Sequence, residues 1–251
     1  MRNEELSGMK KIYYMIGVAA MLLSACVKNT LYRTPHPDRG AVTISLTGLA
    51  ATDDYVMDID GQTADIDGSP FTCPWLLAPG AHSLVVYNRA EGFTFDGRTA
   101  RVNAPGGMSR ADGASVIPLP GYLKTACREM TVAADDTLRV SPAPQQRVRD
   151  LQLELEVTQG RPELIQSVTA TLGGIAGAFD MEAEQTIGEP VSTVFAFARE
   201  GSKLTANVRL LGAMGAVQTM VLDIVFVDGG RTQHTEVDLT EALADFNGDM
   251  T

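Results

Sequence analysis

The sequence predicts an all-β protein built from two tandem β-sandwich domains, of the immunoglobulin-like kind, and three observations support that prediction. Short stretches rich in β-branched residues alternate with polar residues along most of the chain. Gly, Pro, Asn and Asp separate these stretches at intervals of about 8 to 12 residues, the spacing typical of β-sandwiches. Long helical periodicity that could alternate with the strands is missing, which disfavours doubly wound α/β folds.

The first half of the chain contains six stretches with strand character. The first, residues 41–48, alternates β-branched and polar side chains as a half-buried strand does. Pro79 and Gly80 form a turn, after which Ser83 to Tyr87 resumes strand chemistry. The expected strands of this half lie within residues 41–48, 55–59, 76–88, 98–104, 114–119 and 129–134.

A break around Ser141 to Gln146, with two prolines and two amides, predicts the boundary between domains 41–145 and 146–251. In the next stretch Leu151, Leu153, Leu155 and Val157 fall strictly on one face, which predicts antiparallel packing on that face. Further strands are expected within residues 166–174, 191–200, 203–212, 220–228 and 233–237. Residues 239–246 have helical spacing, so one short terminal helix is expected, capped by Asp238 or Thr240.

Composition excludes several classes of function. The chain has 251 residues, of which 45% are hydrophobic, and a net charge of −11, so a phosphate-backbone binder is poorly supported and no nucleic acid partner is expected. Its three histidines, at positions 36, 82 and 234, are scattered, and its three cysteines contain no CxxC pair. Neither a zinc module nor a disulfide-dense miniprotein fits this pattern.

The first residues have the features of an export signal, predicted to span residues 1–25. Lys10 and Lys11 precede an apolar run from Ile12 to Ala25, whose 14 residues are too few to span a bilayer core of about 30 Å as a helix. Because the preceding segment is polar and mildly acidic, Met1 and Met9 are both open as the start of translation.

The run ends in Leu23-Ser24-Ala25-Cys26, which resembles the lipobox of bacterial lipoproteins. That resemblance implies that Cys26 is acylated after cleavage and anchors the chain, since several acyl chains hold a protein on a membrane almost permanently. The alternative is an ordinary secretory signal with an incidental cysteine. Residues 26–40 then form the lipidated N-terminus and a linker with two prolines, and the mature chain carries a charge of −12.

Two cysteines remain in the mature chain, Cys73 and Cys127, in an oxidising compartment where a disulfide could persist. A bridge across so long a loop would stabilise the fold by about 4 kcal/mol in the chain-entropy model. The alternative, two separate small core residues, is weighted equally.

Motifs for catalysis or cofactor binding are not found, so no enzyme, cofactor or metal is expected. The string from Gly107 to Ala111 lacks the second glycine of a nucleophile elbow, and no HExxH, GxGxxG or phosphate-cradling loop is present. The aspartates between Asp53 and Asp67 have the alternation of a calcium loop but lack its glutamate, so a solvated hairpin is the preferred interpretation. Trp75, between apolar neighbours, is either a core residue or an exposed ligand contact.

Several segments together resemble the fimbrillin-like lipoproteins of Bacteroidetes, including the anchor and accessory subunits of type V fimbriae. Besides the lipobox and the first strand, the resemblance rests on residues 76–97, with a Pro-Gly turn and a strand ending in Val86-Tyr87-Asn88, and on residues 151–158, 166–179 and 237–247. It implies a non-catalytic, transthyretin-like two-sandwich lipoprotein of the outer membrane that assembles with other fimbrial subunits or cell-surface proteins by β-strand addition.

In that family, polymerising subunits are trimmed at an arginine in the leader, and the resemblance implies Arg33 or Arg39 as the position of such a cut. An anchor that keeps Cys26 would leave both arginines uncut, and this is the preferred interpretation. The sequence after Cys26 lacks an acidic stretch, so both a surface and a periplasmic orientation stay open. The alternative function is a glycan-binding outer-membrane lipoprotein that uses Trp75 with Tyr87 or Tyr122.

Overall fold

The computed structural model describes residues 38–47, 54–107, 115–227 and 230–248. All described strands lie in one compact unit, which begins at Arg39. The expected signal peptide, Cys26 and Arg33 lie outside the described residues. Within the described residues, no helix has the length and apolar character needed to cross a membrane.

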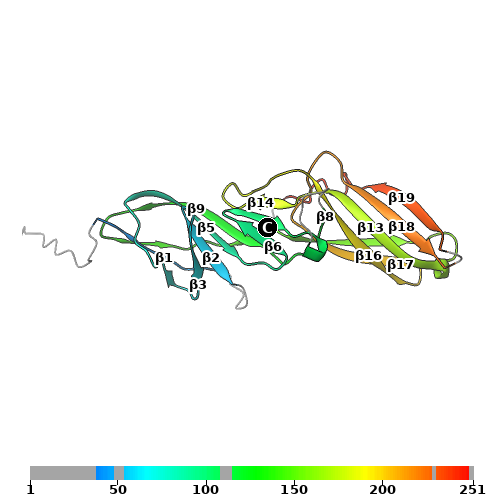
Figure 1. The fold of residues 1–251 in the computed structure, drawn as a ribbon, viewed down its shortest axis with the longest axis horizontal. Coiled ribbons are helices and arrows are strands. Elements are labelled where there is room, and N and C mark those ends of the chain that lie inside the picture. The colour runs from blue at the N-terminus through cyan, green and yellow to red at the C-terminus, as the bar shows by residue number, and fades with distance from the viewer. Residues whose placement is uncertain (1–37, 48–53, 108–114, 228–229, 249–251) are drawn as a thin grey trace, which may run out of the picture. The chain divides into compact units, whose positions relative to one another are not determined.

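The predicted all-β class is confirmed. Eight of the strands within residues 41–146 form two sheets that face each other (Figure 1). A three-stranded sheet has the order β10-β1-β4, with β1 and β10 parallel, and a five-stranded sheet has the order β11-β9-β5-β2-β3. The strands are β1 (Ala41–Ile44), β2 (Tyr55–Ile59), β3 (Gln62–Ile66), β4 (Phe71–Thr72), β5 (Gly80–Asn88), β9 (Lys124–Val132), β10 (Thr137–Val140) and β11 (Gln145–Gln146).

The remaining strands form a seven-stranded and a four-stranded sheet. The larger one has the order β12-β17-β16-β13-β18-β19, with β8 added in parallel to β16, and the smaller one has the order β15-β14-β7-β6. The strands are β6 (Phe93–Asp96), β7 (Thr99–Val102), β8 (Ser115–Val116), β12 (Arg149–Glu156), β13 (Ile165–Ile175), β14 (Ala178–Asp180), β15 (Gln185–Thr186), β16 (Val191–Glu200), β17 (Lys203–Leu210), β18 (Thr219–Phe226) and β19 (Thr232–Asp238), and two single 3-10 turns are η1 (Pro105–Gly107) and η2 (Pro162–Leu164).

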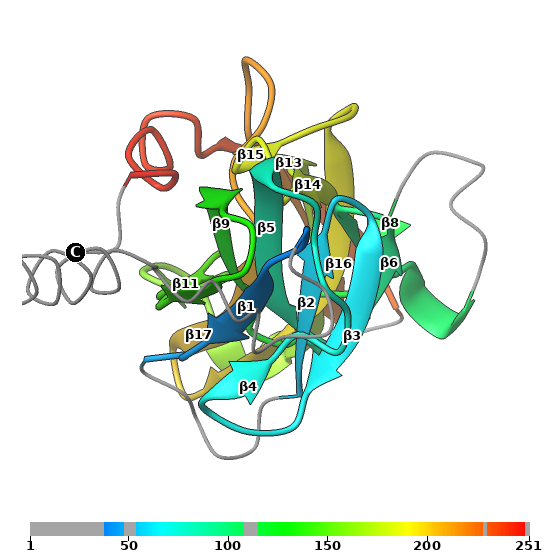
Figure 2. The same ribbon diagram turned by 90° about the vertical axis from the view of Figure 1, so that its left-hand side faces the viewer.

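The centre of the five-stranded sheet, formed by β2 and the second half of β5, is buried on both faces and separates two hydrophobic cores. In β5, Leu84 and Val86 belong to a smaller core shared with β1, whereas Val85 and Tyr87 belong to a larger core. Because side chains alternate along a strand, a continuous apolar run is what burial on both faces requires. Figure 2 shows β5 running between β9 and β2, so both of its edges are paired within the sheet.

The larger core extends from the five-stranded sheet into the seven-stranded sheet, so it contains residues from both predicted domains. Hydrogen-bonded pairing also crosses residue 145, since β7 pairs with β14 and β8 pairs with β16. The expected alternation in β12 is confirmed, because its leucines pack against the larger core while its polar residues are exposed. The division into domains 41–145 and 146–251 stays a prediction.

The expected terminal helix is wrong in form, because residues 240–247 fold into successive turns. Asp238 does act at its start, where its carboxylate accepts a hydrogen bond from Thr240 N at 2.8 Å. Only Leu243 N makes a helical bond, to Leu239 O, and the bonds that follow span three residues, as from Phe246 N to Leu243 O. A segment this short has little helical stability of its own, so its contacts with the body decide its path.

A β-bulge in β13 depends on a glycine. The register shifts between Gly173 and Ile175, and Gly174 between them has a φ of +75°. A Cβ at Gly174 would lie 2.1 Å from the backbone oxygen of Val217.

We therefore expect Gly174→Ala to lower the free energy of unfolding by at least about 2 kcal/mol, because it adds a backbone clash to the strain of a left-handed residue. Gly188→Ala is the matched control, since Gly188 has a φ of +90° but open space around the added Cβ. It should cost about 1 kcal/mol. Urea unfolding measures both, and equal losses would contradict the role of the close approach.

Candidate functional site

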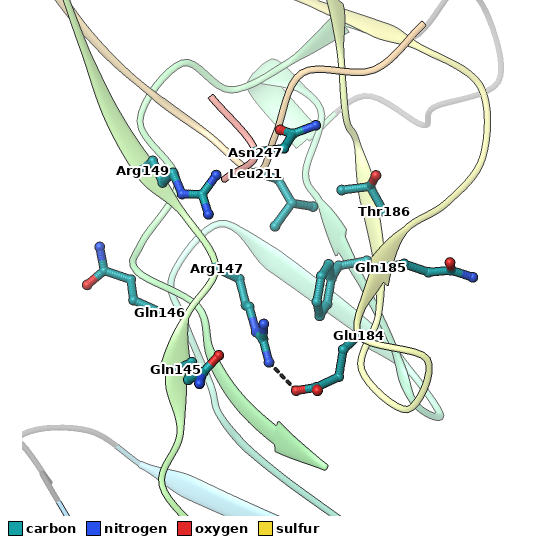
Figure 3. A pocket seen from close by; sticks show the side chains of 10 residues that line it. Gln145, Gln146, Arg147, Arg149, Glu184, Gln185, Thr186, Leu211 and Asn247 are labelled. Carbon is teal, nitrogen blue, oxygen red and sulfur yellow. Dashed lines mark hydrogen bonds and ion pairs between the residues drawn. The ribbon is translucent and has the colours of Figure 1, made fainter. Parts of the chain in front are cut away.

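A pocket of about 530 Å³ lies among three segments that are distant in the sequence (Figure 3). One wall is β11 and the residues that follow it, the opposite wall is the β14–β15 hairpin, and the end is closed by Leu211 and the C-terminal turns. The lining residues are Gln145, Gln146, Arg147, Arg149, Phe179, Glu184, Gln185, Thr186, Leu211 and Asn247.

Arg147 ties the two long walls of the pocket together. Its Nε donates to Thr125 Oγ1 at 2.8 Å, and its Nη2 forms an ion pair with Glu184 across the pocket, as Figure 3 shows. The guanidinium carbon lies 5.2 Å from the ring centre of Phe179, a cation–π distance. Glu184 has a φ of +51°, an uncommon conformation for a residue other than glycine, and the ion pair fixes the carboxylate of this turn residue.

Arg149 fixes the end wall. Its two terminal nitrogens donate to the carbonyl oxygens of Phe246 and Gly248, and its guanidinium carbon lies 5.9 Å from the ring centre of Phe246. The side chain of Asn247 both donates to and accepts from the backbone of Ala213, at 2.8 Å in each direction. The C-terminal turns, which stand in place of the expected helix, are thus held to the rest of the folded chain by the side chains of Arg149 and Asn247.

Three polar side chains of the pocket have no intramolecular partner among the described residues. The side chains of Gln145 on one wall and of Gln185 and Thr186 on the other form no side-chain hydrogen bond there. The sequence does not predict this site, since residues 141–146 have the composition of a boundary between domains. No local signal predicts that β11 and β15, which are 40 positions apart, face each other.

A second polar cluster connects the central sheet to the β6–β7 and β14–β15 turns. The Asp58 side chain is only 2% exposed, and its Oδ1 accepts from Arg98 Nε at 2.9 Å and Nη2 at 2.7 Å. Arg98 Nη1 in turn donates to Ser83 Oγ at 2.8 Å and to Glu182 Oε1 at 2.6 Å. A buried charge of this kind is tolerated because it is paired and hydrogen-bonded.

The aspartate-rich stretch forms the expected hairpin, β2–β3, and three of its carboxylates have partners within the protein. Asp60 and Gly61 at its tip have φ values of 52° and 88°, as a tight Asp-Gly hairpin turn requires. Asp58 binds Arg98, Asp60 binds His82 and Asp65 binds Arg89. Among the described residues no three ligating side chains are placed to hold a metal ion, and Asp53 lies outside them.

His82 is held between two acceptors. Its Nδ1 lies 2.6 Å from Asp60 Oδ2 and its Nε2 lies 2.8 Å from the carbonyl oxygen of Ala78. Both contacts are hydrogen bonds only when both ring nitrogens carry a proton, so the geometry favours the imidazolium. The hydrogen bond to Asp60, then that to Ala78, raises the pKa of His82. Burial opposes the shift at Asp60, but the His82 and Ser83 hydrogen bonds outweigh it and lower the pKa of Asp60.

Cys73 and Cys127 are free thiols in the structure. Cys73 is buried in the smaller core, whereas Cys127 packs against the larger core on the other side of the five-stranded sheet. The sheet thus lies between the two thiols, and a disulfide between them stays a prediction.

The three aromatic residues considered for glycan contact do not form a common platform. Trp75 packs against the smaller core with its Nε1 buried, and Tyr87 is 7% exposed and stacks on Phe95 at 4.9 Å. Tyr122 donates to Asp150 and has the guanidinium of Arg209 over its ring at 4.2 Å. Arg39, an expected processing position, is exposed and donates to Leu76 O at 3.4 Å.

These sheets and cores define an all-β sandwich protein, and comparison with solved structures narrows that class. A candidate adhesin from Bacteroides ovatus ATCC 8483 is 17% identical with a TM-score of 0.66, over 87% of this chain and 88% of that chain. The fimbrial anchor protein Mfa2 from Porphyromonas gingivalis is 12% identical with a TM-score of 0.56, over 84% and 86% of the two chains.

A candidate polysaccharide-binding protein from Bacteroides thetaiotaomicron VPI-5482 is 10% identical with a TM-score of 0.51, over 85% of each chain. No protein-family model matches the sequence, and the search of curated proteins gives no match. At these identities the likeness shows the fold, which is the fold that the resemblance to fimbrillin-like lipoproteins implies.

We expect Asp58→Ala to lower the free energy of unfolding by about 3 to 5 kcal/mol, because it leaves the Arg98 charge without its buried partner. Asp65→Ala is the control, since it breaks the Arg89–Asp65 ion pair, whose side chains are 52% and 69% exposed, and should cost less than about 1 kcal/mol. Urea unfolding of both variants measures the difference, and similar losses would contradict a special role for the buried pair.

We expect a pH-dependent stability from His82. Because the pKa of His82 is raised on folding, its contribution is fully present below its ordinary value of 6.5 and is lost as the pH rises through the folded pKa. The lowered pKa of Asp60 means that its contribution is present above 3.8 and is lost on acidification through the folded pKa. Urea midpoints recorded from about pH 5 to about pH 9 should fall in the wild type and change less in His82→Gln. Identical pH profiles would show that the pair does not contribute.

Proposed function

We propose that this protein is a structural or adhesive lipoprotein of the cell envelope, serving as a fimbrial anchor or minor fimbrial subunit. The observation that carries the proposal is a fold shared along most of both chains with a fimbrial anchor protein and a candidate adhesin. The lipobox-like sequence ending in Cys26 supports it independently, since an anchor must be attached to a membrane. No catalytic activity is part of the proposal.

The proposed location is the outer membrane, with acylated Cys26 as the anchor and residues 27–40 as the linker to the folded body. Strand β1 begins at Ala41, directly after this linker. The net charge of −12 on the mature chain favours a soluble body that stays off anionic surfaces. Partners in this location are other fimbrial subunits or cell-surface proteins.

The proposed mode of assembly is β-strand addition, and β12 is the edge that suits it best. It is eight residues long and stands at the end of the seven-stranded sheet, so only β17 pairs with it among the described strands. Leu151, Leu153 and Leu155 on its inner face are only partly buried. An added strand would satisfy the free backbone groups of β12 and cover these leucines further.

The first test is the mature N-terminal peptide of the protein in the native host. Mass spectrometry of the outer membrane and of sheared filaments should find acylated Cys26 in the membrane and at filament bases. A terminus just after Arg33 or Arg39 in filaments would instead indicate a polymerising subunit, which retains the fimbrial role and overturns the anchor. Absence from every filament fraction would overturn the fimbrial role.

A Cys26→Ser variant is the matched control for the membrane attachment. It should appear in the soluble envelope fraction, because the thiol that accepts the lipid is gone while the folded body is unchanged. If this variant stays in the outer membrane, lipid attachment at Cys26 is not the anchor.

A further inference from the structure

We propose that His82 is a proton-operated latch for the start of β1. While its imidazole ring is protonated, the contact with Ala78 O keeps the segment that binds Arg39 and Gly40 in place. The peptide bond between these two residues is then shielded from proteases. Once the ring is neutral, the contact with Ala78 is lost and the bond becomes accessible. The proposal does not rest on the fimbrial role, because every contact that it uses lies within the described chain.

The backbone on both sides of the Arg39–Gly40 bond is engaged in hydrogen bonds. Arg39 O accepts from Asp135 N at 2.8 Å, and Gly40 exchanges two hydrogen bonds of 2.9 Å with Leu77, one in each direction. Gly40 is buried, although Arg39 is exposed. A peptide bond whose neighbouring backbone is held in this way is cut mainly from a locally opened state.

The segment of residues 76–78 connects His82 to the start of β1. Ala78 O lies 2.8 Å from His82 Nε2, and Leu77 forms an isolated β-bridge with Gly40. Leu77 is also buried in the smaller core, so it joins the two contacts rigidly. Opening this segment requires that both contacts break, so losing the contact at Ala78 lowers the free energy of opening.

Protonation decides whether both ring nitrogens of His82 can donate. The imidazolium donates from Nδ1 to Asp60 Oδ2 at 2.6 Å and from Nε2 to Ala78 O at 2.8 Å. The neutral ring carries only one N–H group. Because a hydrogen bond to a carboxylate is stronger than one to a carbonyl, the remaining proton stays on Nδ1. The hydrogen bond to Ala78 is therefore the one that is lost, and two acceptors then face each other.

Asp60 is the charged group that contacts His82, and it sets the pH range of the latch. The hydrogen bond to Asp60, then that to Ala78, raises the pKa of His82 above its ordinary value of 6.5. The pKa of Asp60 is lowered, so its carboxylate stays charged over the same range. The latch is therefore closed at about pH 6 and opens as the pH rises through the folded pKa of His82.

The other charged groups on the elements packed around this pair are paired or exposed. They are Asp58, Arg98, Glu129 and Glu182. Three of them form the paired cluster around Arg98, and the fourth is exposed on β9. On β9 the residue opposite His82 is the uncharged Met130. Strands β1 and β10 contribute apolar side chains to the smaller core, and Arg139 of β10 is exposed.

The experiment measures trypsin cleavage after Arg39 in the full mature, acylated chain in detergent, at about pH 6 and about pH 9, from the fragment that begins at Gly40. Each rate is divided by that of a synthetic peptide of residues 34–45 at the same pH, because trypsin activity itself depends on pH. We expect the normalised rate of the wild type to rise at least about fivefold between the two pH values, because the segment opens more often without the contact to Ala78.

His82→Gln should be cut at the high normalised rate at both pH values, because an uncharged amide cannot donate at both of its ends. His234→Gln is the matched control, since His234 also contacts an aspartate, Asp223, but is exposed on β19. It should keep the wild-type pH profile. Cleavage after Arg209, within β17, reports unfolding of the whole chain and should stay slow at both pH values.

Equal normalised rates at the two pH values in the wild type would overturn the proposal, as would a His82→Gln variant that keeps the wild-type profile. A rise at Arg209 in parallel with the rise at Arg39 would also overturn it, since the chain would then be unfolding as a whole. The fimbrial role is tested in filament fractions, so failure of the latch is distinguishable from failure of that role.

Discussion

The burial of the centre of the five-stranded sheet, β2 and the second half of β5, on both of its faces is the constraint on which the rest of the structure depends. It forces β5 to carry apolar side chains toward two cores in turn, Leu84 and Val86 to one and Val85 and Tyr87 to the other. A polar side chain that is buried in such a sheet needs a hydrogen-bonding or charged partner within the protein. Asp58 has such a partner in Arg98, which reaches it from the turn between β6 and β7. The ion pair therefore links the four-stranded sheet, which contains β6 and β7, to the five-stranded sheet, which contains β2.

The pocket lies between the edges of two sheets. Because β11 and β15 are only two residues long and stand at the ends of their sheets, neither edge is extended by a further described strand. The space between them is bridged by a side-chain ion pair, Arg147 with Glu184, in place of a backbone ladder.

Local patterns predicted most of the strands because their causes are local. Strict alternation located β12, and β16 has the bounds that its sequence indicated, residues 191–200. The features that local patterns did not predict depend on contacts between residues that are distant in the sequence. The insertion of β8 beside β16 needs Val116 O to accept from Thr193 Oγ1, 77 positions away, and no local pattern encodes that pairing. The terminal turns follow the carbonyl contacts of Arg149, which also cannot be inferred from residues 239–248 alone.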